Sequence, residues 1–214
     1  MKIKSVTTME IYLKRSGNKM LLLNAITGFS GSLSLRNNLH SFLDDIVGNS
    51  PEIKKNYLFS SSKTCVEDSI QFLYKNKKKD DNILLIGKSL GGIRTWWIIY
   101  KYFVNLKNLL VNDTKLSVIL LDPHGWQSGD GHTGSYGINN NILPEKEEWA
   151  LYESIDITCI YQRNKYPKGA HFNNFNNIKL GSTADHWNIE NIETPTGKLV
   201  AEYIDKTIKT LTGV

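Results

Sequence analysis

The sequence predicts an α/β protein with a mostly parallel central sheet flanked by helices. Short apolar segments of strand length alternate along the chain with longer segments whose apolar residues recur at helical spacing. This alternation is typical of β-α-β units, in which the strands run parallel and the helices cover the sheet. In addition, the apolar run 83–86 ends at a glycine and a new apolar segment follows almost at once. That pattern indicates a tight turn from a buried strand into a helix.

Composition limits the class of protein. The 214 residues are 40% hydrophobic and 22% charged, as in ordinary globular proteins. We expect one domain spanning residues 1–214, without a large cap domain. No apolar run approaches the roughly 18 residues of a membrane span, and the N-terminus lacks the apolar core of a signal peptide. The sequence therefore predicts a soluble, cytoplasmic protein, with export by a non-classical route as the alternative.

The chain is basic, with a net charge of +5 and a pI near 9.0. Part of this charge is a lysine-rich run at 75–79, at the end of a predicted helix. A solvated helix end, where the helix dipole favours cations, is the favoured interpretation. Weak contact with an anionic surface is the alternative. No recognisable nucleic-acid-binding module accompanies it, so we expect no nucleic-acid partner.

The first half of the chain contains four predicted strands and three predicted helices. The strands are expected where apolar or β-branched residues run together, at 2–13, 20–26, 56–60 and 83–86. The helices are expected at 35–47, from 64 to the lysine-rich run, and from the turn after 86 to about 110. Thr64 and Glu67 have the spacing of a capping box. A turn at 15–18 separates the first two strands.

The second half continues the alternation. Strands are predicted at 115–121, 155–161 and 178–181, and a helix at 144–153. A final helix begins with Thr194 as its cap and Pro195 at its first position. Its inward face is predicted to carry Leu199, Val200, Tyr203, Ile204 and Ile208. Cys65 and Cys159 are expected to be free buried thiols rather than a disulfide or a metal site.

The segment Gly87-Lys88-Ser89-Leu90-Gly91 has the pattern G-x-S-x-G between a predicted strand and a predicted helix. In that context the pattern predicts a nucleophile elbow, a sharp turn that leaves the serine hydroxyl exposed at its apex. Gly87-Lys88-Ser89 also resembles the end of a phosphate-binding P-loop, but that motif needs a glycine where Asn82 stands. An ordinary strand-to-helix turn without chemistry remains an alternative.

With these residues in view, the chain resembles the α/β-hydrolase superfamily, especially its small lipases and esterases. The likeness rests on Gly87-Lys88-Ser89-Leu90-Gly91-Gly92, on Leu121-Asp122-Pro123 and on Asp185-His186-Trp187. The resemblance implies an acyl-serine intermediate and a triad in the chain order serine, acid, histidine. Ser89, Asp122 and His186 have that order. It implies no cofactor and no metal.

A serine hydroxyl needs a base to remove its proton. The resemblance implies a base between the last strand and the final helix, and His186 alone of the five histidines lies there. His40 is expected on the surface of its helix. The spacing of His124, Asp130 and His132 matches no strong metal-ligand motif, so we expect no metal there.

The acid is predicted to be Asp122, with Asp130 as the second choice. Many superfamily members carry the acid after the strand that ends here at Tyr161, but Gln162-Arg163-Asn164 offers no carboxylate. Another branch carries it one strand earlier in a Leu-Asp-Pro context, which 121–123 resembles. Asp185 is a poor candidate, since adjacent side chains usually point in different directions.

The oxyanion of a tetrahedral intermediate needs backbone N–H donors. The resemblance implies one donor at Leu90 and a second in the loop after the 20–26 strand, at Phe29 or Ser30. Tentative substrate contacts are Lys88, Trp126 and Trp187. Lys88 replaces the histidine common before the serine in lipases, and it would either favour anionic substrates or lie at the rim of the pocket. The glycine-rich loop 125–136 is either a surface loop or a flap beside the acid.

The main functional hypothesis is therefore a serine hydrolase of the esterase, lipase or thioesterase type, acting on a small-molecule or lipid ester. One alternative is a catalytically inactive binding module on the same fold. The other is a nucleotide-dependent transferase that uses Gly87-Lys88-Ser89. Acyl-chain length and oligomeric state are not encoded in any pattern we recognise.

Overall fold

The computed structural model describes residues 19–28, 38–109, 114–123, 155–165, 169 and 175–213. Three predicted elements lie outside these residues: the strand at 2–13, the turn at 15–18 and the helix at 144–153. The 125–136 loop also lies outside them, together with Asp130.

A parallel sheet forms the centre of the described structure. Its strands are β1 (Leu21–Thr27), β2 (Ile53–Phe59), β3 (Asn82–Lys88), β4 (Leu116–Leu121), β5 (Asp156–Tyr161) and β6 (Asn176–Lys179). They lie in the order β2-β1-β3-β4-β5-β6, and each pair of neighbours is parallel. The predicted α/β class with a mostly parallel sheet is confirmed.

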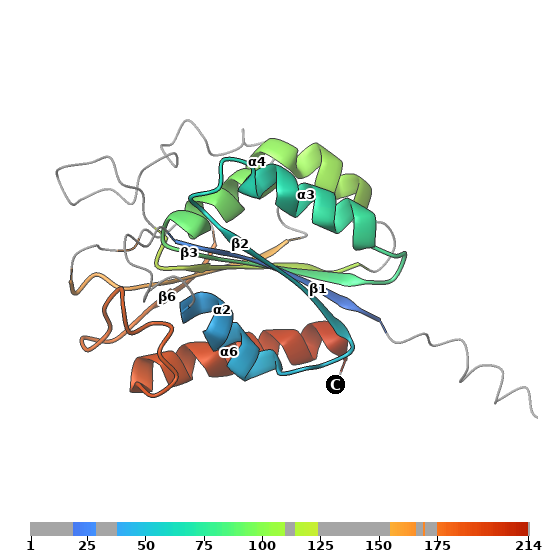
Figure 1. The fold of residues 1–214 in the computed structure, drawn as a ribbon. Coiled ribbons are helices and arrows are strands. Elements are labelled where there is room, and N and C mark those ends of the chain that lie inside the picture. Colours follow the sequence, from blue (N-terminus) through green and yellow to red (C-terminus); the bar gives the residue numbers. More distant parts are fainter. Residues whose placement is uncertain are drawn as a thin grey trace, which may run out of the picture.

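Helices cover both faces of this sheet (Figure 1). Helices α3 (Cys65–Asn76) and α4 (Leu90–Leu109) lie on one face, and α2 (Asn38–Val47) and α6 (Pro195–Thr212) lie on the other. On β3, Leu85 joins the core on the α3/α4 face, whereas Leu84 and Ile86 join the core on the α2/α6 face. Because both faces of the strand are buried, its sequence is an unbroken apolar run rather than an alternating one.

The strand order changes direction between β1 and β3. From β1 the chain crosses to β2 at one side and then returns past β1 to β3. Helix α2 makes the first crossing on one face and α3 makes the second on the other. In open α/β sheets, ligands bind outside the carboxyl ends of the strands at such a switch point. Here those ends are Thr27 and Lys88.

Several local expectations hold. The Thr194 hydroxyl accepts a hydrogen bond from the backbone N–H of Gly197 at 2.9 Å, and Pro195 begins α6, as predicted. Cys65 and Cys159 are buried and form no disulfide with each other, as predicted. Burial raises the pKa of both thiols, and the nearby Asp122 charge raises that of Cys159 further.

Other expectations are wrong in detail. The Thr64 hydroxyl donates to Asp68 Oδ2 at 2.8 Å and does not cap α3, so the capping box does not form. Leu199 is 52% exposed, although it was expected on the inward face of α6. His40 is buried rather than on the surface, because its ring stacks on Tyr57 of β2 with centroids 4.7 Å apart. Strand β2 also starts earlier than predicted, at Ile53.

Within the described residues, no helix combines the length and the apolar character needed to span a bilayer.

The first turn of α4 packs directly on the backbone of β1, and this contact predicts the effect of one substitution. A Cβ atom at Gly91 would lie 2.0 Å from the carbonyl oxygen of Ile26. Because that neighbour is backbone, it cannot rotate away, and Gly91→Ala is expected to destabilise the protein by about 3 kcal/mol or more. Urea unfolding followed by circular dichroism measures this loss.

Gly181→Ala is the matched control, because a Cβ atom there would meet nothing within 4 Å. We expect it to change the free energy of unfolding by less than about 0.5 kcal/mol. Equal stability of the two variants would contradict the packing described for Gly91.

Candidate active site

Ser89 forms the turn between β3 and α4. Its φ angle is 56°, in the left-handed region that non-glycine residues rarely adopt. The backbone N–H of Ser89 donates to the carbonyl oxygen of Leu121 at 2.9 Å, which fixes the turn to the end of β4. Strained residues of this kind cost about 1–3 kcal/mol and cluster at functional sites. The predicted tight turn from strand to helix is therefore present with Ser89 at its apex, although Ser89 is only 5% exposed.

The backbone after β1 lies against the Ser89 side chain. A Cβ atom at Gly28 would lie 2.7 Å from Ser89 Cβ, so only glycine fits there without a shift of the chain. Phe29 and Ser30, the predicted second oxyanion donors, follow Gly28 but lie outside the described residues. Leu90 is the first residue of α4. The first N–H groups of a helix have no acceptor within the helix.

Asp122 follows β4 and carries the buried charge of the site. Its side chain is 0% exposed, and its φ angle of 42° also lies in the left-handed region. Its Oδ2 atom lies 2.6 Å from Nδ1 of His186, whose side chain is only 4% exposed. The structure thus brings together the predicted acid and the predicted base, which are far apart in the sequence.

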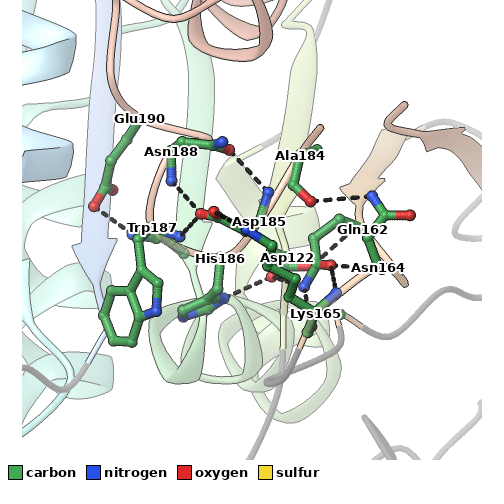
Figure 2. Close-up of polar contacts among 12 residues, drawn as sticks. Asp122, Gln162, Asn164, Lys165, Ala184, Asp185, His186, Trp187, Asn188 and Glu190 are labelled. Carbon is green, nitrogen blue, oxygen red and sulfur yellow. Dashed lines mark hydrogen bonds and ion pairs between the residues drawn. The ribbon is translucent and has the colours of Figure 1, made fainter. Parts of the chain in front are cut away.

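His186 lies in the turn segment between β6 and α6. Its neighbour Asp185 does not face it. The Asp185 Oδ1 atom accepts hydrogen bonds from the backbone N–H groups of Trp187 and Asn188, both at 2.9 Å. Burial alone would raise the pKa of Asp185, but these hydrogen bonds and the nearby Lys165 lower it below its ordinary value. Asp185 therefore shapes the turn that carries His186, as Figure 2 shows.

Lys88 does not lie at a pocket rim, and this expectation is wrong. Its ammonium group forms an ion pair with Glu190, and the two side chains are only 6% and 4% exposed. The Lys88 Nζ atom also lies 5.9 Å from the centre of the Trp187 ring. Because Glu190 already neutralises the charge of Lys88, Lys88 offers no free cation to an anionic substrate. Gly87 and Lys88 belong to strand β3, which also excludes a phosphate-binding loop at this point.

The same ion pair connects two parts of the site. Lys88 precedes Ser89, and Glu190 lies on the turn segment that carries His186. Trp187 is 53% exposed, and its ring meets the His186 ring edge-on with centroids 5.1 Å apart. Trp187 thus packs against the predicted base and leaves about half of its surface exposed. Trp126 lies outside the described residues.

Gln162 is a site residue that the sequence analysis missed. It follows β5, at the position where many superfamily members carry the acid, and its amide cannot act as that acid. In the structure its backbone N–H donates to Asp122 Oδ1 at 3.0 Å, and its side-chain amide donates to Asp122 Oδ2 at 3.2 Å (Figure 2). The available signal was its position, since the ends of neighbouring parallel strands meet at one edge of the sheet.

No cluster of three or more His, Cys, Asp or Glu side chains suited to a metal ion occurs in the part of the chain that the structure describes.

The Lys88–Glu190 pair leads to a prediction on stability. Lys88→Met leaves the Glu190 carboxylate buried without its partner, which typically costs about 3–5 kcal/mol. The double variant Lys88→Met/Glu190→Leu removes both charges and is expected to regain most of that loss. Urea unfolding of the two variants and the wild type measures the difference.

The exposed ion pair of Lys209 with Asp205 is the matched control. Its side chains are 60% and 41% exposed, so Lys209→Met is expected to cost less than about 1 kcal/mol. A Lys88→Met variant as stable as Lys209→Met would show that the buried pair is not formed in solution.

No protein-family model and no curated protein matches the sequence. Solved structures do match. A protein from Lactobacillus plantarum WCFS1 assigned as a cell surface hydrolase matches with a TM-score of 0.53 and 11% identity, over 91% of this chain and 93% of that one. Est1E from Butyrivibrio proteoclasticus, solved with ferulic acid bound, matches with a TM-score of 0.53 and 12% identity, over 94% and 93%.

A third structure, from Agrobacterium vitis S4 and also assigned as a hydrolase, matches with a TM-score of 0.51 and 11% identity, over 90% of this chain and 88% of that one. At these identities the likeness concerns the fold. Together with the parallel sheet and the turn at Ser89, it shows that this chain has the α/β-hydrolase fold.

Proposed function

We propose that the protein is a serine hydrolase that cleaves a carboxylic ester or thioester through an acyl-serine intermediate. The observation that carries this proposal is the buried contact between Asp122 and His186, at the sheet edge where Ser89 adopts a left-handed turn. A nucleophile, a base and a buried acid are the three groups that acyl transfer to serine requires. The ferulic acid bound to Est1E, a protein of the same fold, supports an acyl substrate.

In the proposed reaction, Ser89 Oγ attacks the carbonyl carbon and His186 Nε2 takes the hydroxyl proton. Asp122 holds Nδ1–H of the imidazole and stabilises the imidazolium that forms. The backbone N–H of Leu90 and one from Phe29 or Ser30 donate to the oxyanion.

When the tetrahedral intermediate collapses, His186 returns the proton to the leaving alcohol or thiol, and the acyl group stays on Ser89. A water molecule then attacks the acyl-serine, again with His186 as the base. The products are the carboxylic acid and the free serine, so no cofactor enters the balance.

The first test is labelling with a fluorophosphonate probe, read by intact mass. We expect one adduct on the wild type and none on Ser89→Ala, because only a serine activated by a base attacks phosphorus at a useful rate. A folded wild type without an adduct would contradict the proposal and leave the binding-module alternative.

Activity measurements then identify the acid. On p-nitrophenyl and feruloyl esters and on acyl thioesters, Asp122→Asn is expected to lower kcat by about 10⁴-fold, since it removes the carboxylate that orients the imidazole. Asp130→Asn is the matched control and is expected to keep wild-type kcat. The reverse pattern would assign the acid to Asp130.

A further inference from the structure

We infer that Gln162 is a positioning residue, which holds the carboxylate of Asp122 in the orientation that His186 needs. This inference rests on the proposed function for its catalytic meaning, but the contact itself can be tested without a substrate. Gln162 is 0% exposed and lies at the end of β5, next to the end of β4 where Asp122 stands.

Gln162 binds both oxygens of the carboxylate. The backbone N–H reaches Oδ1 at 3.0 Å and the side-chain Nε2 reaches Oδ2 at 3.2 Å. Oδ2 is also the atom that contacts His186 Nδ1. Because Gln162 donates to both oxygens, it resists rotation of the carboxylate. His186 contacts only one oxygen and would not prevent that rotation by itself.

The amide of Gln162 is itself fixed. Its Oε1 atom accepts from the backbone N–H groups of Asn164 at 2.8 Å and of Lys165 at 3.0 Å. Its Nε2 atom also donates to the Lys165 carbonyl at 3.0 Å. A flipped amide would point its nitrogen at two N–H donors and its oxygen at the carboxylate. The turn thus determines that the donor side of the amide faces Asp122.

The buried charge makes this support necessary. An ionised carboxylate that is wholly removed from water needs hydrogen-bond donors to offset its lost hydration. Gln162 supplies two donors, and Nδ1 of His186 supplies a third in the tautomer that carries its proton there. The backbone at Gly169 closes over the same group, since a Cβ atom there would lie 1.8 Å from Asp122 Oδ1. The residue at the end of β5 is thus an amide that donates to the carboxylate after β4, rather than a second carboxylate.

Gln162→Met tests the inference, because methionine has a similar length and keeps the backbone donor while it removes the side-chain amide. We expect kcat for ester hydrolysis to fall about 10–100-fold with little change in KM, the usual loss when a group that orients a catalytic side chain is removed. In the Asp122→Asn background the same substitution is expected to change kcat by less than about twofold, since it acts only through the carboxylate. Equal losses in the two backgrounds would overturn the inference.

Two further variants separate positioning from folding. Gln162→Glu keeps an acceptor for the N–H groups of Asn164 and Lys165 but places an oxygen against Asp122 Oδ2. We expect kcat to fall at neutral pH at least as much as in Gln162→Met, although the turn is retained. Lys198→Ala is the control, because Lys198 is an exposed residue of α6 that belongs to neither turn. It is expected to keep wild-type kcat.

A spectroscopic reading does not depend on turnover. His186 Nδ1 lies 2.6 Å from Asp122 Oδ2. The proton on Nδ1 is therefore expected to give a downfield proton NMR signal, which disappears in Asp122→Asn. In Gln162→Met this signal should shift and broaden as the carboxylate loosens. An unchanged signal would refute the positioning role, whereas a wild type without a fluorophosphonate adduct would refute only the proposed hydrolase function.

Discussion

The fully buried carboxylate of Asp122 is the constraint around which the carboxyl edge of the sheet is built. A charge in that position requires donors from several directions. Nδ1 of His186 contacts it from the turn segment between β6 and α6, and Gln162 donates to it twice from the end of β5. The segments after β4, β5 and β6 therefore meet at Asp122. The contact between Asp122 and His186 both offsets the burial of the carboxylate and holds the base of the proposed reaction.

The buried ion pair of Lys88 and Glu190 connects the two halves of the site. Lys88 at the end of β3 binds Glu190, which follows His186 on its turn segment. Such pairs contribute little net stability, because the cost of removing both charges from water offsets their attraction. In this structure the ion pair joins strand β3, which ends just before the proposed nucleophile, to the segment that carries the proposed base.

Much of the framework follows from local sequence. The unbroken apolar run of β3, the glycines around Ser89, and Thr194 with Pro195 at the start of α6 each specify their structure over a few residues. One error arose where side chains from distant segments meet, and another arose from helical periodicity itself. His40 is buried because a tyrosine of β2 stacks on it, and Leu199 is exposed although helical periodicity placed it on the inward face of α6.

The sequence by itself determined the fold class and the tight turn at Ser89, because both follow from patterns within a few residues. The resemblance to a known superfamily then made Asp122 and His186 the acid and base to consider. Only the tertiary structure decided that Lys88 is neutralised by Glu190 and that Gln162 supports the acid. The parallel register of β4 and β5 brings Gln162 to Asp122, whereas the path of the segment after β6 brings Glu190 to Lys88. From the sequence alone, neither the partner of Lys88 nor the partner of Gln162 can be identified, because each partner lies in a distant segment of the chain.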